Sequence, residues 1–134
     1  MIRKVYGINV AVKDFKSALE RFVHVLNVKP KFFKETDFAF PNLIGAQLFF
    51  DDVAINVIGS KSEKTAIAKF VNSRGEGVFL VSLLVDDIEN DVIEMKTKGV
   101  NFVTEIKEVP LGKVIFSHPK SMHGVQFEFL QLKR

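Results

Sequence analysis

The fold is decided by a stretch near the start of the chain, residues 5–15, which reads VYGINVAVKDF. Its apolar residues alternate with small and polar ones, and this period of two indicates a strand over about residues 5–12 with one buried face. Asp14 is a residue type that favours a helix N-cap. The apolar residues that follow at helical spacing are Phe15, Ala18, Leu19, Phe22, Val23 and Leu26. The stretch therefore predicts a strand and then an amphipathic helix, which ends before Pro30.

The same order recurs in the second half of the chain. Val12 and Asp14 recur 73 residues later as Val85 and Asp87. A second alternating strand precedes this point, and a second helical stripe follows it until Gly99 ends the helix. Further strands are expected at about 31–40, 46–51 and 53–59 in the first half, and at 101–108, 113–117 and 124–131 in the second. The repeat therefore predicts the element order β-α-β-β-β twice.

We expect one α+β domain over residues 1–134, with a first module at about 3–60, a connecting helix at about 62–73 and a second module at about 76–132. Two βαβββ modules can pair their curved sheets into a cup with the helices outside. The side chains expected to line the cup are Gly7, Asn9, Ala54, Asn56, Leu80, Ser82, Gln126 and Glu128. Those expected to face the helices are Ile8, Val10, Ile55, Val57, Val81, Leu83, Phe127 and Phe129. A slip of one residue would exchange the two sets.

Composition excludes several functional classes. The net charge of +3 is spread over lysines that alternate with acids, without a basic stripe, so no nucleic-acid partner is expected. No apolar run reaches the roughly 18 residues that span a bilayer, and the N-terminus does not resemble a signal peptide, so we expect a cytoplasmic protein without a membrane partner. There is no cysteine, whereas fourteen phenylalanines must fill a core or line an apolar cavity.

Several segments in order resemble a known family. They are residues 10–15, 67–70, 74–77, 85–88, 98–100, 118–121 and 124–125. Together they resemble the methylmalonyl-CoA epimerase branch of the vicinal-oxygen-chelate superfamily, which includes glyoxalases and bleomycin-resistance proteins. The resemblance covers nearly the whole chain and is weakest at about residues 30–50. It implies the paired βαβββ fold of the glyoxalases and a homodimer.

The resemblance also implies four metal ligands, at the positions of Gly7, Asn56, Leu80 and Glu128. Only Glu128 is a strong ligand, and Asn56 is a weak oxygen donor, whereas transition metals prefer imidazole and carboxylate groups. We therefore expect a degenerate metal site, with no bound metal and no other cofactor. Without a metal, the enolate of an epimerase reaction would lose its main electrostatic stabilisation.

We predict a metal-independent protein that binds an apolar or acyl small molecule in the cup. Glu128 is the candidate general base or acid, because burial of a carboxylate raises its pKa. It would catalyse isomerisation, cyclisation or elimination, so the enzyme would be an isomerase or a lyase. The candidate ligand-binding residues are Gly7, Asn9, Asn56, Leu80, Ser82 and Gln126.

Two other interpretations stay open. The first is a non-catalytic ligand-binding or resistance protein, in which Glu128 is a relic of an ancestral site or pairs with a nearby cation. Replacing Glu128 would then change affinity modestly, and no product would form. The second is a metal-dependent methylmalonyl-CoA epimerase or lactoylglutathione lyase-like enzyme, which a chelator would inhibit.

Overall fold

The computed structural model describes residues 1–134, which form eight β-strands and three α-helices. The chain divides into two compact units. We call residues 7–79 the N-terminal unit, and residues 1–6 together with 80–134 the C-terminal unit. Strands β1 (Ile2–Ala11) and β5 (Gly77–Val85) each contribute residues to both units.

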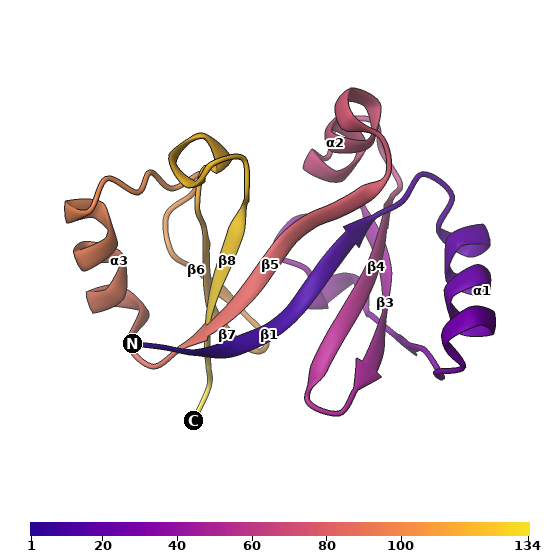
Figure 1. The fold of residues 1–134 in the computed structure, drawn as a ribbon, viewed down its shortest axis with the longest axis horizontal. Coiled ribbons are helices and arrows are strands. Elements are labelled where there is room, and N and C mark those ends of the chain that lie inside the picture. Colours follow the sequence, from indigo (N-terminus) through magenta and orange to yellow (C-terminus); the bar gives the residue numbers. More distant parts are fainter. The chain divides into compact units, whose positions relative to one another are not determined.

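The N-terminal unit contains a sheet with the strand order β2-β3-β4-β1. Strand β1 pairs with β4 in parallel, whereas the β3–β4 and β2–β3 pairs are antiparallel. Helix α1 lies beside β3 and β4, and α2 follows β4 (Figure 1). The remaining elements of the unit are α1 (Phe15–Leu26), β2 (Lys31–Phe32), β3 (Leu43–Phe50), β4 (Val53–Ser60) and α2 (Ala66–Arg74).

The C-terminal unit repeats this plan with the strand order β5-β8-β7-β6. Its first and last strands, β5 and β8, again pair in parallel, and the β7–β8 and β6–β7 pairs are antiparallel. The elements that follow β5 are α3 (Ile88–Thr97), β6 (Lys107–Val109), β7 (Gly112–Phe116) and β8 (Phe127–Leu132). The α+β class and the repeated order of elements, predicted from the recurring strand and helix patterns, are therefore confirmed.

Both helix starts form where the sequence predicted them. The Asp14 carboxylate accepts a hydrogen bond from the Ser17 backbone N–H at 3.1 Å, which satisfies a free donor in the first turn of α1. Asp87 caps α3 in the same way through the backbone N–H of Asn90, at 3.2 Å. Asp87, which recurs 73 residues after Asp14, is thus the N-cap of α3.

Each main helix covers one face of its own sheet. The core under α1 includes Leu19, Leu48 and Val57, with Val10 packed against it. The core under α3 includes Val92 and Phe129, and Leu83 and Phe127 pack there. Since neighbouring residues of a strand point to opposite faces, Asn9, Asn56, Ser82 and Glu128 lie on the faces away from α1 and α3.

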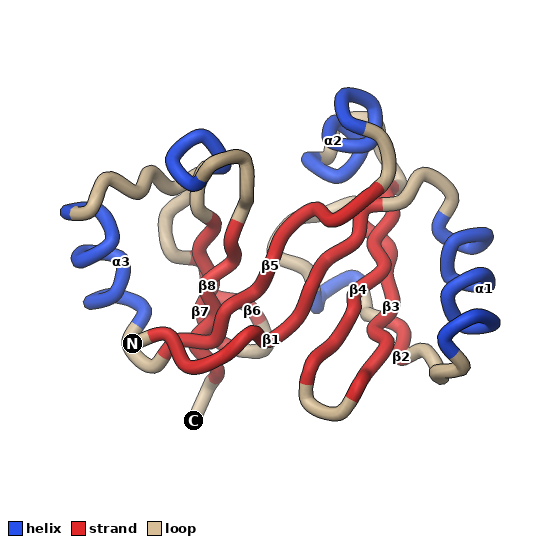
Figure 2. Tube along the Cα trace, viewed as in Figure 1, coloured by secondary structure: helices blue, strands red, loops and turns tan.

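Three predicted elements differ from the structure. The strand expected at 31–40 is reduced to β2, because residues 35–37 form a 3₁₀ turn in which Asp37 accepts from the Lys34 backbone N–H at 2.8 Å (Figure 2). The connecting helix begins at Ala66 instead of 62, since hydroxyl contacts such as Ser60 to Thr65 at 2.6 Å hold the preceding residues in a loop.

The strand expected at 101–108 is largely a loop. It makes one isolated bridge, between Phe102 and Ser117, before β6 begins. Phe102 and Ile106 instead pack against the α3 core, so burial of these side chains replaces strand pairing. No helix of the chain combines the length and the apolar character needed to cross a membrane.

Candidate functional site

Ser82 and Glu128 form a hydrogen-bonded pair in the C-terminal unit. They stand directly opposite each other on the parallel strands β5 and β8. The Ser82 hydroxyl donates to Oε1 of Glu128 at 2.7 Å, and Ser82 is only 2% exposed. The other carboxylate oxygen, Oε2, makes no hydrogen bond to the protein. The serine thus fixes one carboxylate oxygen, and the other has no hydrogen-bond partner in the protein.

Burial raises the pKa of the Glu128 carboxyl group, and the hydrogen bond from Ser82 opposes that rise only in part. The residue as a whole is half-buried, but protein atoms surround its carboxyl group closely. No cation contributes to the pKa of Glu128, whereas Asp86, Asp91, Glu89 and Glu94 of the same unit do form ion pairs. The carboxylate is therefore neither a salt-bridge partner nor an ordinary solvated surface group.

The two other predicted residues of this unit lie close to the pair in the sheet. Leu80 is buried two residues before Ser82, on the same face of β5. Gln126 is half-buried, and its backbone carbonyl accepts from the Val81 backbone N–H at 3.1 Å. Leu80 therefore contributes an apolar surface beside Ser82, and Gln126 continues the β5–β8 pairing.

The predicted residues of the N-terminal unit form a second cluster. Gly7 stands opposite Ala54, and Asn9 stands opposite Asn56, on the parallel strands β1 and β4. The Asn56 Nδ2 group donates to Oδ1 of Asn9 at 2.8 Å. Asn56 is 8% exposed, and its own Oδ1 is fully buried without a hydrogen-bond partner.

Gln47, which the apolar alternation of its own strand does not single out, stands opposite Asn56 on the neighbouring strand β3. The hairpin turn at Asp51 and Asp52 could have revealed it. Counting outward from that turn pairs Phe50 with Val53, and three steps further it pairs Gln47 with Asn56. Each step along a regular antiparallel ladder moves both partners by one residue.

The residues present do not fit the metal that the resemblance implies. Gly7 and Leu80 have no side-chain donor atom. A Cβ at position 7 would lie 2.9 Å from the backbone oxygen of Ala54, so this strand pair is too close for a larger residue without a shift. Asn56 and Glu128 already make hydrogen bonds within their own units. No group of three or more His, Asp or Glu side chains is placed to hold a metal ion.

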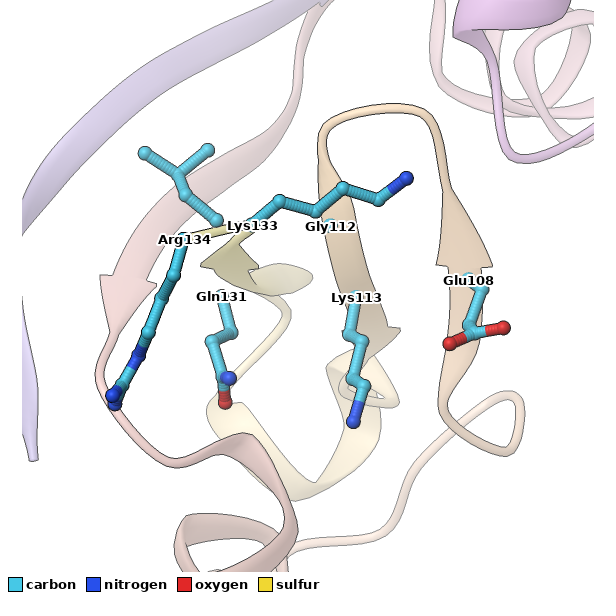
Figure 3. Close-up of a pocket in the computed structure, with 7 residues that line it drawn as sticks. Glu108, Gly112, Lys113, Gln131, Lys133 and Arg134 are labelled. Atoms are coloured by element: carbon cyan, nitrogen blue, oxygen red, sulfur yellow. The ribbon is translucent and has the colours of Figure 1, made fainter.

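A small surface pocket of the C-terminal unit lies where strands β6 and β7 meet the end of β8. Its volume is about 140 Å³, below the roughly 300–1,000 Å³ of ordinary ligand sites. Lys113, Gln131 and Arg134 extend to one side of it, whereas Lys133 extends to the other (Figure 3). The Lys113 ammonium is already paired with Glu89 at 2.6 Å. We therefore assign the pocket no role.

The protein is built from two βαβββ repeats. Each repeat carries one polar cluster, Asn9 with Asn56 in the first and Ser82 with Glu128 in the second. Two of the four expected metal positions, Gly7 and Leu80, have no side-chain donor atom. Residues 7–116 match the family described as the Glyoxalase/Bleomycin resistance protein/Dioxygenase superfamily. The chain belongs to this superfamily. No curated protein sequence matches it.

Solved structures agree with the family assignment. A hypothetical protein from Bacillus halodurans C-125 is 32% identical, with 98% of this chain and 95% of that chain covered and a TM-score of 0.85. Methylmalonyl-CoA epimerase in complex with methylmalonyl-CoA and NH4+ is 21% identical, covering 98% and 96%, with a TM-score of 0.83. Methylmalonyl-CoA epimerase from Mycobacterium tuberculosis is 21% identical, covering 99% and 90%, with a TM-score of 0.82. The likeness to the epimerases concerns the fold alone.

Proposed function

We propose that the chain binds a small apolar or acyl molecule and acts on it without a metal, through general acid/base chemistry at Glu128. The observation that carries this proposal is the Ser82–Glu128 pair, in which a buried carboxyl group has one oxygen held at 2.7 Å by the serine hydroxyl and no cation beside it. A carboxyl group whose pKa is raised toward the working pH is a more effective proton acceptor than an ordinary one.

The proposed reaction begins with removal of a proton from a carbon next to a carbonyl group. Oε2 of Glu128 accepts the proton, and the C–H electron pair moves into the enolate. Delivery of that proton to a different carbon of the delocalised enolate gives isomerisation. Attack of the enolate on a second carbonyl, with the proton passed to the new alkoxide, gives cyclisation, and loss of a β-substituent that takes the proton gives elimination. Ser82 keeps the carboxylate oriented, and the neighbouring Leu80 supplies an apolar surface that favours proton transfer in a water-poor setting.

The test is proton exchange in D2O, followed by NMR at the α-carbon of an acyl thioester, with methylmalonyl-CoA as the first probe. We expect exchange with the wild-type chain, with or without EDTA, and loss of at least about 100-fold in Glu128→Gln. Glu105→Gln is the matched control, because Glu105 is exposed. Exchange that survives unchanged in Glu128→Gln would contradict the proposed role of Glu128.

The same experiment separates the other interpretations. Binding of the thioester without exchange in any variant would identify a non-catalytic binding protein. Exchange that EDTA abolishes and added Co²⁺ restores would identify a metal-dependent enzyme. The donor set at Gly7 and Leu80 argues against that last outcome.

A further inference from the structure

An irregular segment, residues 34–42, joins β2 to β3 in the N-terminal unit. Each of its ends is attached by one backbone hydrogen bond: the Phe33 N–H donates to the Gly45 carbonyl at 3.0 Å, and the Lys61 N–H donates to the Asn42 carbonyl at 2.8 Å. The 3₁₀ turn between these ends is closed by bonds within the segment itself. Most of the segment is exposed, so its contact with the sheet depends on the few side chains that turn inward.

Phe38 is the side chain through which the segment covers the sheet. It is half-buried and packs against the buried cluster of Ala11, Ile58 and Ile67. Ala11 and Gly45 both stand opposite Ile58 in the strand pairing, and their neighbours in sequence pack against α1, so all three lie on the face away from α1. The 3₁₀ turn of the segment accordingly lies on the other side of β3 and β4 from α1 (Figure 2).

Gly45 makes room for this cover. A Cβ at Gly45 would lie 3.1 Å from the tip of the Phe38 ring and 3.0 Å from the Phe33 ring. The centroids of the two rings are 5.1 Å apart, so both rings rest on a strand position that has no side chain. A half-buried ring that rests on backbone loses less apolar contact when it leaves than a fully enclosed ring does.

We propose that residues 34–42 are a lid, which opens from the sheet while the rest of the N-terminal unit stays folded. When the Phe38 ring moves away, it uncovers the apolar surface of Ala11, Ile58 and Ile67, and an apolar ring or acyl chain of similar size packs there in its place. Because the ring occupies this surface in the closed form, a ligand reaches it only after the lid opens. The inference rests on the proposed function for the apolar nature of the ligand.

The chain has no cysteine, so a single introduced thiol reports the accessibility of one position. Ala11→Cys places the thiol under the lid. Ala46→Cys is the matched control, because both alanines are 0% exposed and Ala46 belongs to the core under α1 on the opposite face. Each variant is labelled with excess DTNB at several urea concentrations below the unfolding transition. We expect Ala11→Cys to be labelled at least about 100-fold faster than Ala46→Cys and with a weaker dependence on urea, since local opening needs less free energy and exposes less surface than global unfolding.

A second pair of variants covers the case in which Ala11→Cys fails to fold. Ile58→Cys lies under the lid and Val57→Cys lies against α1, although the two residues are neighbours on β4. Labelling rates that are equal within each pair, with the same dependence on urea, would overturn the inference. The labelling involves neither a ligand nor Glu128, so the lid can fail while Glu128-dependent exchange is observed, and the reverse.

Three further substitutions identify the segment that opens. Gly45→Ala adds a methyl group beneath both rings, so it should hold the lid open more often and speed the labelling of Ala11→Cys about ten-fold. Gly7→Ala is the control: its Cβ would lie 2.9 Å from a backbone oxygen, much like the 3.0 Å approach at Gly45, but it meets no ring, so labelling should change less than about three-fold. Thr65→Ala weakens the N-cap of α2, which carries Ile67, and should also change labelling less than about three-fold. An acceleration by Gly7→Ala or Thr65→Ala that equals the effect of Gly45→Ala would show that another element uncovers Ala11, and the lid would be refuted.

Discussion

Replacing Ser82 with alanine removes the one hydrogen bond that the protein gives to the Glu128 carboxylate. The bond spans 2.7 Å and its donor is 2% exposed, so water cannot easily replace it. A hydrogen bond to a charged group is worth about 1.5–3 kcal/mol, and one between neutral groups about 0.5–1.5 kcal/mol. We therefore expect Ser82→Ala to lower the free energy of unfolding by about 1.5–3 kcal/mol when Glu128 is ionised, and by about 1 kcal/mol less when it is protonated.

The sign of the pH dependence follows from the raised pKa of Glu128. Because the folded state holds this proton more tightly than the unfolded state, the stability contributed by Glu128 is fully present below the unfolded pKa of about 4.3. That contribution is lost as pH rises through the folded pKa. Ser82→Ala raises the folded pKa further, so the variant should lose stability more steeply than the wild type over this range. Glu128→Gln should lack this part of the pH dependence.

Urea unfolding of the wild type, Ser82→Ala, Glu128→Gln and the double variant, at pH values from about 4 to 9, measures these differences. In the Glu128→Gln background the serine contacts a neutral amide, so its removal should cost only about 0.5–1.5 kcal/mol at every pH. A cost of Ser82→Ala that is the same at low and high pH, or below about 0.5 kcal/mol throughout, would refute the assignment of a buried, ionisable hydrogen-bonded pair.

Three further predictions concern stability. Asn56→Leu removes a buried acceptor that has no partner, and it also removes one hydrogen bond. Thermal unfolding should therefore show a melting temperature that is unchanged or raised by up to about 5 °C. A fall of that size would show that a partner satisfies Oδ1 of Asn56 in the free protein. Gly7→Ala should lower the free energy of unfolding, measured in urea, by about 1–3 kcal/mol, because its Cβ would lie 2.9 Å from the backbone oxygen of Ala54. Gly77→Ala is the control: its Cβ would meet open space, so the free energy of unfolding should fall by less than about 0.5 kcal/mol. Asp87→Ala should cost about 1 kcal/mol through loss of the α3 cap, seen as a lower urea midpoint with an unchanged slope; no change would mean that the cap contributes nothing.

The repeat and its helices could be predicted from the sequence because their signals are local. Asp14 and Asp87 cap their helices through atoms three residues away, and the apolar stripe behind Asp14 has the period of a helix. Alternation along β1, β4, β5 and β8 likewise placed Asn9, Asn56, Ser82 and Glu128 on the faces opposite the helices, since a strand has a period of two. Where polar runs and hydroxyl groups compete with the backbone, as near Lys34 and Ser60, local patterns overestimated the regular structure.

Other properties depend on pairing between distant segments. The sequence could nominate Ser82 and Glu128 separately, but only the parallel register of β5 and β8 places them 2.7 Å apart. Gln47 joins Asn56 only because β3 and β4 form a ladder, and the unpartnered Oδ1 of Asn56 is a consequence of three-dimensional burial. The sequence by itself therefore determined the residue types, the repeat and the face of each strand. The tertiary structure decided which polar groups meet, which remain unpaired and which way the pKa of Glu128 moves, because burial and cross-strand distance arise only when separate segments pack together.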